Sequence, residues 1–181
     1  IEIDGVDIST VGLEDLRDRI TIIPQEPVLF QNTLRFNLDP IDKCTDEQIK
    51  DILERANLSD LLTRDGNGIK FQITEKGANL SAGEKALICI CRAALRDNKI
   101  VLMDEATSSI DVNTEEVIQK LIQEEFKDST VITVAHRLNT IMESDKIAVL
   151  SFGKLSEYGS PKTLLENKTS AFSELVNQFN S

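Results

Sequence analysis

The chain is predicted to fold as an α/β domain around a parallel sheet, because two apolar strands flank an amphipathic helix. The apolar run 100–103 ends at Asp104, which is typical of a strand buried on both faces whose carboxyl end lies at a ligand-binding edge. A run rich in β-branched residues, 130–135, predicts the second strand. Apolar residues at helical spacing over 117–126 connect the two, as in the strand–helix–strand units of parallel sheets.

The segments before this unit predict an edge strand or hairpin, a second strand and a helix. Residues 1–8 alternate in polarity and residues 19–23 form a short apolar strand pattern. Thr45 and Gln48 have the spacing of a capping box, which predicts a helix start. The apolar face of that helix is expected to pack against neighbouring helices, through Ile49, Ile52, Leu53 and Ala56.

A glycine-rich turn at 65–68 is predicted to lead into a strand at 70–74 and then a helix over 85–96. Near the end of the chain, two further strands, 146–150 and 155–158, are expected on either side of a turn at Gly153. After them a single terminal helix is predicted, because proline is favoured at the first helical position and Pro161 follows Ser160. Its packing residues are expected to be Leu164, Leu165, Phe172, Leu175 and Val176.

The composition is that of a globular domain with a marked acidic excess. With 181 residues, 40% of them hydrophobic, one sizeable core can be buried. The net charge of −11 argues against a nucleic-acid partner, since such binding depends on basic side chains that neutralise phosphates. The three cysteines do not have the spacing of a metal site or a disulfide framework, so buried reduced thiols are expected. No apolar stretch approaches the roughly 20 residues of a membrane-spanning helix, and the start does not resemble a signal peptide.

Asp104 and Glu105 form a candidate catalytic pair at the end of the central strand. A hard carboxylate in this place suits a Mg²⁺ ion that bridges nucleotide phosphates, and the next carboxylate is placed to orient or deprotonate a water. An exposed turn after a buried strand is the alternative interpretation.

A second candidate site lies in residues 80–84, Leu-Ser-Ala-Gly-Glu, just before the helix 85–96. A turn of small residues that opens a helix leaves backbone N–H groups free for an anion such as a γ-phosphate. The same residues also fit a plain capping box, in which the Glu84 side chain accepts a hydrogen bond from the Ser81 N–H.

Read in order, these motifs resemble the Walker B and signature sequences of ABC transporters. Gln25 resembles the Q-loop glutamine, His136 the switch histidine, and residues 109–111, Ser-Ile-Asp, the D-loop. Residues 75–77, Glu-Lys-Gly, look like the X-loop of exporters. Four further segments have sequences that resemble those of the second, C-terminal nucleotide-binding domain in the multidrug-resistance-associated C subfamily: 1–8, 23–30, 33–40 and 135–142.

The resemblance implies a P-loop NTPase-like ABC ATPase domain with a parallel-sheet catalytic core, 1–30 and 97–181, and a helical subdomain, approximately 31–96. It implies ATP and Mg²⁺ as cofactors, with Asp104 and Gln25 at the metal. Glu105 would polarise the attacking water and His136 would stabilise the γ-phosphate. The implied nucleotide-contacting residues are Gln25, Leu80, Ser81, Ala82, Gly83, Glu84, Ser109 and Asp111.

The implied partners are a second nucleotide-binding domain, which completes a head-to-tail ATP sandwich, and transmembrane domains, which meet the Q-loop and the X-loop. This arrangement implies work at the cytoplasmic face of a membrane. The signature departs from Leu-Ser-Gly-Gly-Gln at Ala82 and Glu84. The methyl group of Ala82 and the negative charge of Glu84 are expected to weaken phosphate binding. This agrees with the resemblance, since members of the family commonly have one weak and one active ATP site.

A P-loop motif, Gly-x-x-x-x-Gly-Lys-Ser/Thr, does not occur in this sequence. We therefore expect the domain to be truncated before its Walker A strand and helix, and the isolated chain to bind little ATP and to be inactive as an ATPase. Two other classes stay open: a nucleotide-gated regulatory domain of a C-subfamily channel or channel regulator, and a non-transport ABC ATPase free of membranes.

Overall fold

The structure is a computed structural model that describes residues 1–104, 110–135 and 141–179. The chain divides into two compact units, Ile1–Thr133 and Val134–Ser181. The first contains the parallel sheet and the two long helices, and the second contains a hairpin and two shorter helices.

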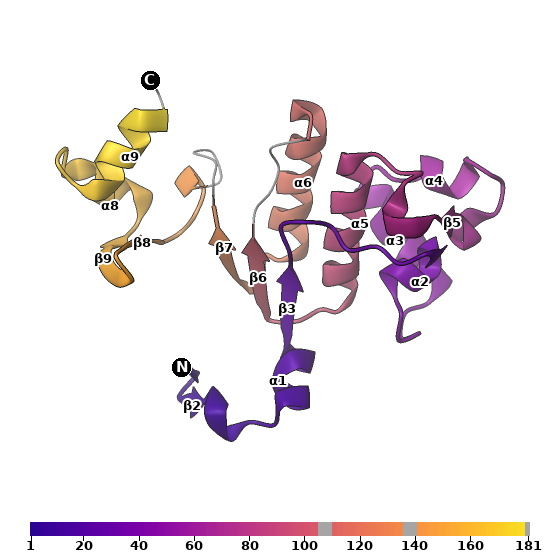
Figure 1. Cartoon of the computed structure of the whole chain (residues 1–181), viewed down its shortest axis with the longest axis horizontal. Coiled ribbons are helices and arrows are strands. Elements are labelled where there is room, and N and C mark those ends of the chain that lie inside the picture. Colours follow the sequence, from indigo (N-terminus) through magenta and orange to yellow (C-terminus); the bar gives the residue numbers. More distant parts are fainter. Residues whose placement is uncertain (105–109, 136–140, 180–181) are drawn as a thin grey trace. The chain divides into compact units, whose positions relative to one another are not determined.

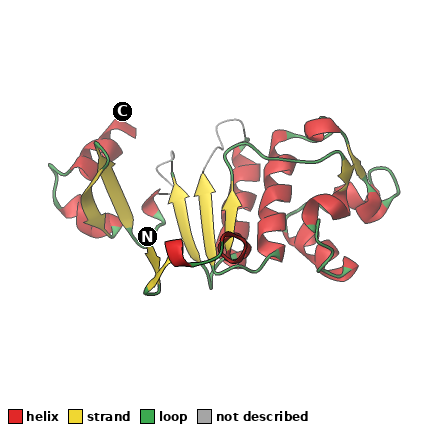
Figure 2. Cartoon of the chain, turned by 60° about the horizontal axis from the view of Figure 1, so that its bottom comes forward, coloured by secondary structure: helices red, strands yellow, loops and turns green. Residues whose placement is uncertain are grey.

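The centre of the first unit is a three-stranded sheet in the order β3–β6–β7 (Figure 1). Its strands are β3 (Ile20–Ile23), β6 (Ile100–Asp104) and β7 (Thr130–Val134). The strands β3 and β6 are parallel, and the three arrows point the same way in both overall views (Figures 1 and 2). The helix α6 (Val112–Glu125) lies between β6 and β7 in the chain, so the predicted strand–helix–strand unit is confirmed.

The sheet is covered on one face only, among the residues described. Thr21, Ile23 and Val101 are buried, and the neighbouring core includes residues of α5 (Ala82–Leu95) and α6. On the other face Ile22 and Ile132 are 67% and 56% exposed. The expectation that β6 is buried on both faces is therefore wrong for the described part of the chain, because both long helices contribute to the core of a single face.

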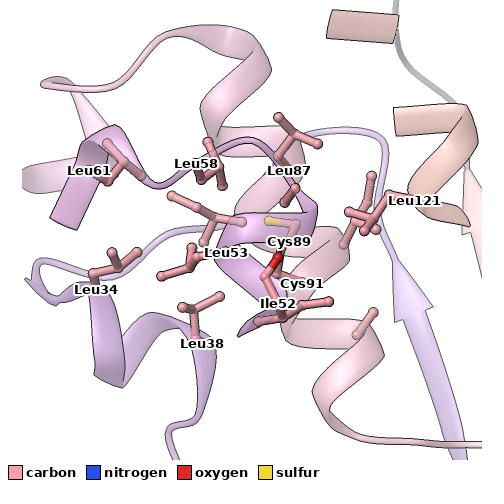
Figure 3. Packing of buried hydrophobic residues seen from close by; sticks show 14 of the residues in the cluster. Leu34, Leu38, Ile52, Leu53, Leu58, Leu61, Leu87, Cys89, Cys91 and Leu121 are labelled. Carbon is pink, nitrogen blue, oxygen red and sulfur yellow. Dashed lines mark hydrogen bonds between the residues drawn. The ribbon is translucent and has the colours of Figure 1, made fainter. Parts of the chain in front are cut away.

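The main hydrophobic core lies among the helices (Figure 3). They are α2 (Leu34–Leu38), α3 (Asp46–Arg55), α4 (Asp60–Thr63), α5 and α6. The predicted capping box at the start of α3 is confirmed, since the Gln48 N–H donates to Thr45 Oγ1 and the Thr45 N–H donates to Gln48 Oε1. The fully buried side chains of this core include Leu34, Leu38, Ile49, Ile52, Leu53, Leu61, Ile88 and Leu121.

The cysteines are free thiols, as predicted. Cys89 and Cys91 are buried in the same core, and Cys44 is half-buried. Burial raises the pKa of Cys91 to about 12. The thiol is therefore inert at neutral pH.

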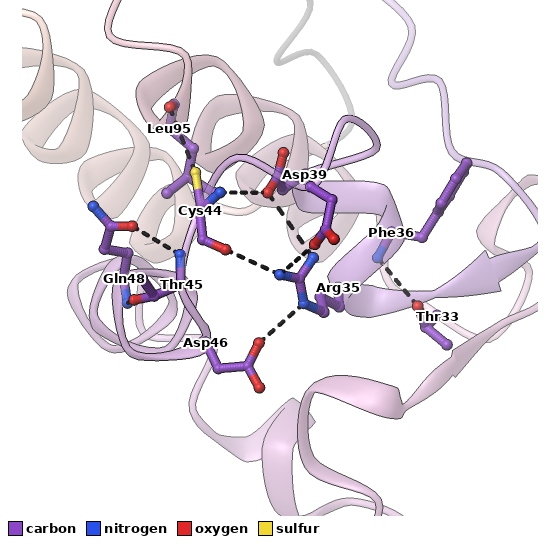
Figure 4. Close-up of polar contacts among 10 residues, drawn as sticks. Thr33, Arg35, Phe36, Asp39, Cys44, Thr45, Asp46, Gln48 and Leu95 are labelled. Carbon is purple, nitrogen blue, oxygen red and sulfur yellow. Dashed lines mark hydrogen bonds and ion pairs between the residues drawn. The ribbon is translucent and has the colours of Figure 1, made fainter.

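Arg35 fixes the loop between α2 and α3 (Figure 4). Its guanidinium donates to Asp46 (3.0 Å) and to the Cys44 carbonyl (2.9 Å), and it is 2.7 Å from the carboxylate of Asp42. The Cys44 N–H in turn donates to the buried Asp39 (2.7 Å). Through these contacts Arg35 holds the loop residues Asp42, Cys44 and Asp46 against the end of α2.

Short elements complete the first unit. The predicted hairpin at the start of the chain is confirmed as β1 (Glu2–Ile3) paired with β2 (Val6–Asp7). The helix α1 (Leu13–Arg19) was not predicted; it has acidic residues in its first turn and basic residues in its last, which suits the helix dipole. A second small antiparallel pair joins β4 (Asn32–Thr33) to β5 (Gln72–Ile73).

The second unit is a hairpin followed by two helices. The hairpin of β8 (Ile147–Ser151) and β9 (Lys154–Gly159) confirms the predicted strands, and Phe152 and Gly153 turn the chain at positive φ. The predicted single terminal helix is instead two, α8 (Pro161–Glu166) and α9 (Ala171–Phe179).

Polar side chains explain the break between these two helices. Asn167 accepts a hydrogen bond from the Thr169 N–H (3.1 Å), and the Ser170 hydroxyl donates to the Leu164 carbonyl (3.1 Å). The carboxylate of Glu157 accepts from the Ala171 N–H (2.8 Å) and so caps the new helix from the hairpin. Across the described ranges, every helix is too short or too polar to span a lipid bilayer.

Candidate active site

Both predicted metal-site residues, Asp104 and Gln25, lie at the same edge of the sheet. Ile23 lies opposite Met103 in the parallel register, so β3 and β6 end side by side. Asp104, the last residue of β6, is exposed, and Gln25 follows β3 by two residues and is also exposed. This is the carboxyl edge, where open parallel sheets bind their ligands.

The oxygen donors of this edge fit Mg²⁺, which takes one or two protein carboxylates and keeps several waters. Within the part of the chain described, no group of three or more His, Cys, Asp or Glu residues is placed to hold a metal ion. The predicted site residues Glu105, Ser109 and His136 lie outside the described residues.

The signature segment forms the predicted capping box at the start of α5. The Glu84 N–H donates to Ser81 Oγ (3.1 Å), and the Ser81 N–H donates to Glu84 Oε2 (2.7 Å). Ser81 and Ala82 are exposed, whereas Leu80 is buried and anchors the turn. The capping role and an anion-facing role are therefore compatible, because the outer surface of this turn stays open.

Gly83 is buried where α5 meets the first turn of α6. A methyl group at Gly83 would lie 2.5 Å from Cγ2 of Thr114. That distance is well below ordinary van der Waals contact, so only glycine fits here without a shift. The two helix starts are in this way held against each other, which the sequence alone did not indicate.

Asp111, a predicted nucleotide contact, is the N-cap of α6. Its carboxylate accepts from the Thr114 hydroxyl (2.7 Å) and from the Thr114 N–H (3.0 Å). These two hydrogen bonds hold the pKa of Asp111 below its ordinary value. The cap also fixes the Thr114 side chain that contacts Gly83.

Glu84 has a second partner that sequence reasoning missed. Arg64, at the C-terminal end of α4, donates from Nη2 to Glu84 Oε1 and also to Asp60 Oδ2 (2.6 Å). The hydrogen bonds to Glu84 and then to Asp60 raise the pKa of Arg64 above its ordinary value. Partial burial acts to raise the pKa of Glu84, but the hydrogen bonds from Arg64 and from the Ser81 N–H outweigh it, so that this pKa is lowered.

A cavity of about 210 Å³ lies beside this ion pair. Its polar wall includes Asn57, Asp60, Ser81, Glu84 and Asn113, which lie just before or within the first turns of α4, α5 and α6. The capping residues of the signature turn are therefore reachable from outside, next to the start of α6.

The predicted Q-loop and X-loop segments also lie together. The predicted X-loop is a short turn in which Gly77 has a φ of +67°, and a methyl group there would lie 2.9 Å from Cδ1 of Leu29. Beside Leu29, Val28 and Phe30 are each 51% exposed, and Phe30 contacts Phe36 edge to face at 6.2 Å. The predicted X-loop turn thus packs on Leu29, whose neighbours in the chain have exposed apolar side chains.

Comparison with known proteins gives a consistent result. A family model described as "ABC transporter" matches residues 1–108. ATP-binding cassette sub-family C member 2 of Rattus norvegicus is 51% identical over 95% of this chain and 11% of that protein. Multidrug resistance protein mrp-7 of Caenorhabditis elegans is 49% identical over 97% of this chain and 12% of that protein. The chain thus spans about a tenth of the length of these relatives.

A solved structure agrees with these matches. A bacterial Atm1-family ABC exporter with ATP bound has a TM-score of 0.89 and 34% identity, with 99% of this chain and 32% of that chain covered. The fold is accordingly that of an ABC ATPase domain. With its family model, its C-subfamily relatives and its fold in agreement, the chain belongs to the ABC transporter family.

Proposed function

We propose that this chain is part of the second nucleotide-binding domain of a C-subfamily ABC exporter, in which it helps to hydrolyse ATP and so powers transport. The observation that carries the proposal is that Asp104, at the end of β6, and Gln25, just after β3, lie at the same edge of the parallel sheet. The signature helix α5 lies directly before β6 in the chain, as the order of motifs requires. The name of one relative, multidrug resistance protein mrp-7, supports an export role.

Each site residue then has a role. Asp104 and Gln25 would hold Mg²⁺, which supplies charge neutralisation at the phosphates when it is bound. Glu105 would polarise the attacking water, and His136 would stabilise charge that develops on the γ-phosphate. Asp111, through its cap on α6, would position the D-loop that includes Ser109.

The signature turn would serve a different nucleotide. In a head-to-tail pair of domains, the Ser81 hydroxyl and the Gly83 N–H would face ATP held by the other nucleotide-binding domain. The exposure of Ser81 and Ala82 supports this orientation. Residues 31–96 would then act as the helical subdomain, with the remaining residues in the catalytic core.

The surface next to Gln25 supports contact with transmembrane domains at the cytoplasmic face of a membrane. Val28, Phe30 and Phe36 offer apolar side chains, and the X-loop turn packs on Leu29 at the same place. A membrane domain that docks there would sense the metal-site edge through the chain between Gln25 and Leu29.

We expect the 181-residue chain alone to show neither tight ATP binding nor hydrolysis, whereas the full-length protein should hydrolyse Mg²⁺-ATP. The sequence contains Asp104 and Glu105 but no P-loop, and a P-loop supplies the backbone N–H groups and the lysine that hold the β- and γ-phosphates. Calorimetry with Mg²⁺ and ATP on the chain, and phosphate release by the full-length protein in lipid, would measure the two halves of this expectation.

Each half can fail separately. Stoichiometric micromolar binding by the chain would contradict the need for a P-loop. A full-length protein that binds ATP without turnover would contradict the export proposal and favour a nucleotide-gated regulatory domain. Equal turnover by a full-length protein that lacks any membrane domain would instead favour a non-transport ABC ATPase.

A further inference from the structure

We propose that Arg64 is a positioning residue for the signature turn: it holds Glu84 in the capping box and offsets its charge, so that an acidic signature can still face a phosphate. The inference rests on the proposed function, because it concerns the turn that would meet ATP on the other domain. It adds a residue that lies outside the motif itself.

The two carboxylate oxygens of Glu84 have different hydrogen-bond partners. Oε2 accepts from the Ser81 N–H (2.7 Å) and closes the capping box, while Oε1 is held by Arg64. Arg64 is itself fixed from two further sides, by Asp60 (2.6 Å) and by the ring of Phe71, whose centroid is 5.9 Å from Cζ of Arg64. The carboxylate is therefore clamped between a backbone N–H and a guanidinium that cannot easily swing away.

The burial of the pair gives this clamp an electrostatic effect. The Glu84 side chain is 17% exposed and that of Arg64 is 36% exposed, so water screens the pair only in part. A lone glutamate in the first turn suits the helix dipole but repels an incoming anion. With Arg64 attached, the charge of Glu84 is offset in part, because Arg64 also pairs with Asp60, and the cap is kept.

The alternative is that Arg64 is a plain surface tether between α4 and α5. A tether would change only the stability of the fold. A positioning residue would change ATP-dependent association of the two nucleotide-binding domains, and the change would depend on whether Glu84 is present.

We would therefore measure this association in the full-length protein for four forms: wild type, Arg64→Gln, Glu84→Gln and the double variant. Arg64→Gln should weaken association by about threefold to tenfold at low salt, because it leaves an uncompensated carboxylate beside the phosphate. Adding Glu84→Gln should restore association close to wild type. High salt should shrink the differences, because mobile ions screen the charge.

Arg55→Gln is the matched control. Arg55 is also an arginine between two carboxylates, those of Asp51 and Glu125, but it joins α3 to α6 away from the signature turn. It should leave ATP-dependent association unchanged. Equal losses in Arg55→Gln and Arg64→Gln, or a double variant as weak as Arg64→Gln, would overturn the inference.

A second readout does not depend on ATP. In the 181-residue chain, the titration of the Glu84 carboxylate followed by NMR should move to higher pH in Arg64→Gln, and a Glu84 titration that does not move would overturn the positioning role directly. If instead the titration moves but the wild-type full-length protein shows no ATP-dependent association, the proposed function fails, and the effect of Arg64 on that association fails with it.

Discussion

Glu105→Gln in the full-length protein should lower ATP turnover by about two to four orders of magnitude, the range for loss of a general base. Glutamine has nearly the shape of glutamate but cannot take a proton from water. Nucleotide binding should stay intact, because the phosphates are held by other groups. Steady-state phosphate release together with an ATP-binding measurement on the same preparation would separate the two effects.

Glu116→Gln provides the control for this change. Glu116 lies on α6 with an exposed side chain, and the substitution is chemically identical. It should leave turnover at the wild-type level. Turnover that is unchanged in Glu105→Gln would remove this residue from the mechanism, and an equal loss in both variants would point to a general effect of charge.

Gly83→Ala should destabilise the chain by roughly 1–3 kcal/mol, the usual cost of overpacking a buried contact. The new methyl group would lie 2.5 Å from Cγ2 of Thr114, and this β-branched side chain is held in place by its hydrogen bond to Asp111. Alanine is otherwise the better helix former, so a loss of stability would show that the contact outweighs the propensity. Urea unfolding of the 181-residue chain would measure it.

Thr114→Ser is the matched rescue. Serine removes Cγ2 but keeps the hydroxyl that caps against Asp111. In this background Gly83→Ala should cost little or become stabilising. If Gly83→Ala is as harmful in the Thr114→Ser background as in the wild-type chain, the close approach of α5 to α6 is not the reason for glycine at this position.

Much of the fold follows from local patterns in the sequence. The capping boxes at Thr45 and Ser81 form as predicted, because each depends on residues three apart in one turn. The strand–helix–strand unit is likewise set by local periodicity. The division of the terminal helix was missed because it depends on Glu157, a residue of β9 that caps α9 at Ala171, 14 residues later in the chain.

The site divides in the same way between local and distant contacts. Asp104 and Gln25 follow neighbouring strands and the signature segment opens a helix, as the local patterns predicted, while the roles of these residues stay predictions. The neighbours of the signature turn could not be predicted from the motifs. Arg64 binds Glu84 from 20 residues away in the chain, and Thr114 approaches Gly83 from another helix. Side chains of this kind have no fixed spacing from the motif, so only the folded structure reveals them.

The exposed signature turn offers the most direct test of the account. In a cysteine-depleted full-length protein, Ala82→Cys should form a crosslink to a cysteine in the P-loop of the other nucleotide-binding domain, because Ala82 lies exposed on the turn that would face that nucleotide. With Glu105→Gln to trap the closed state, Mg²⁺-ATP should raise the yield several-fold, while Glu47→Cys on the exposed side of α3 should give none. A yield that does not respond to ATP, or that is equal at the two positions, would contradict a head-to-tail ATP clamp built from this chain.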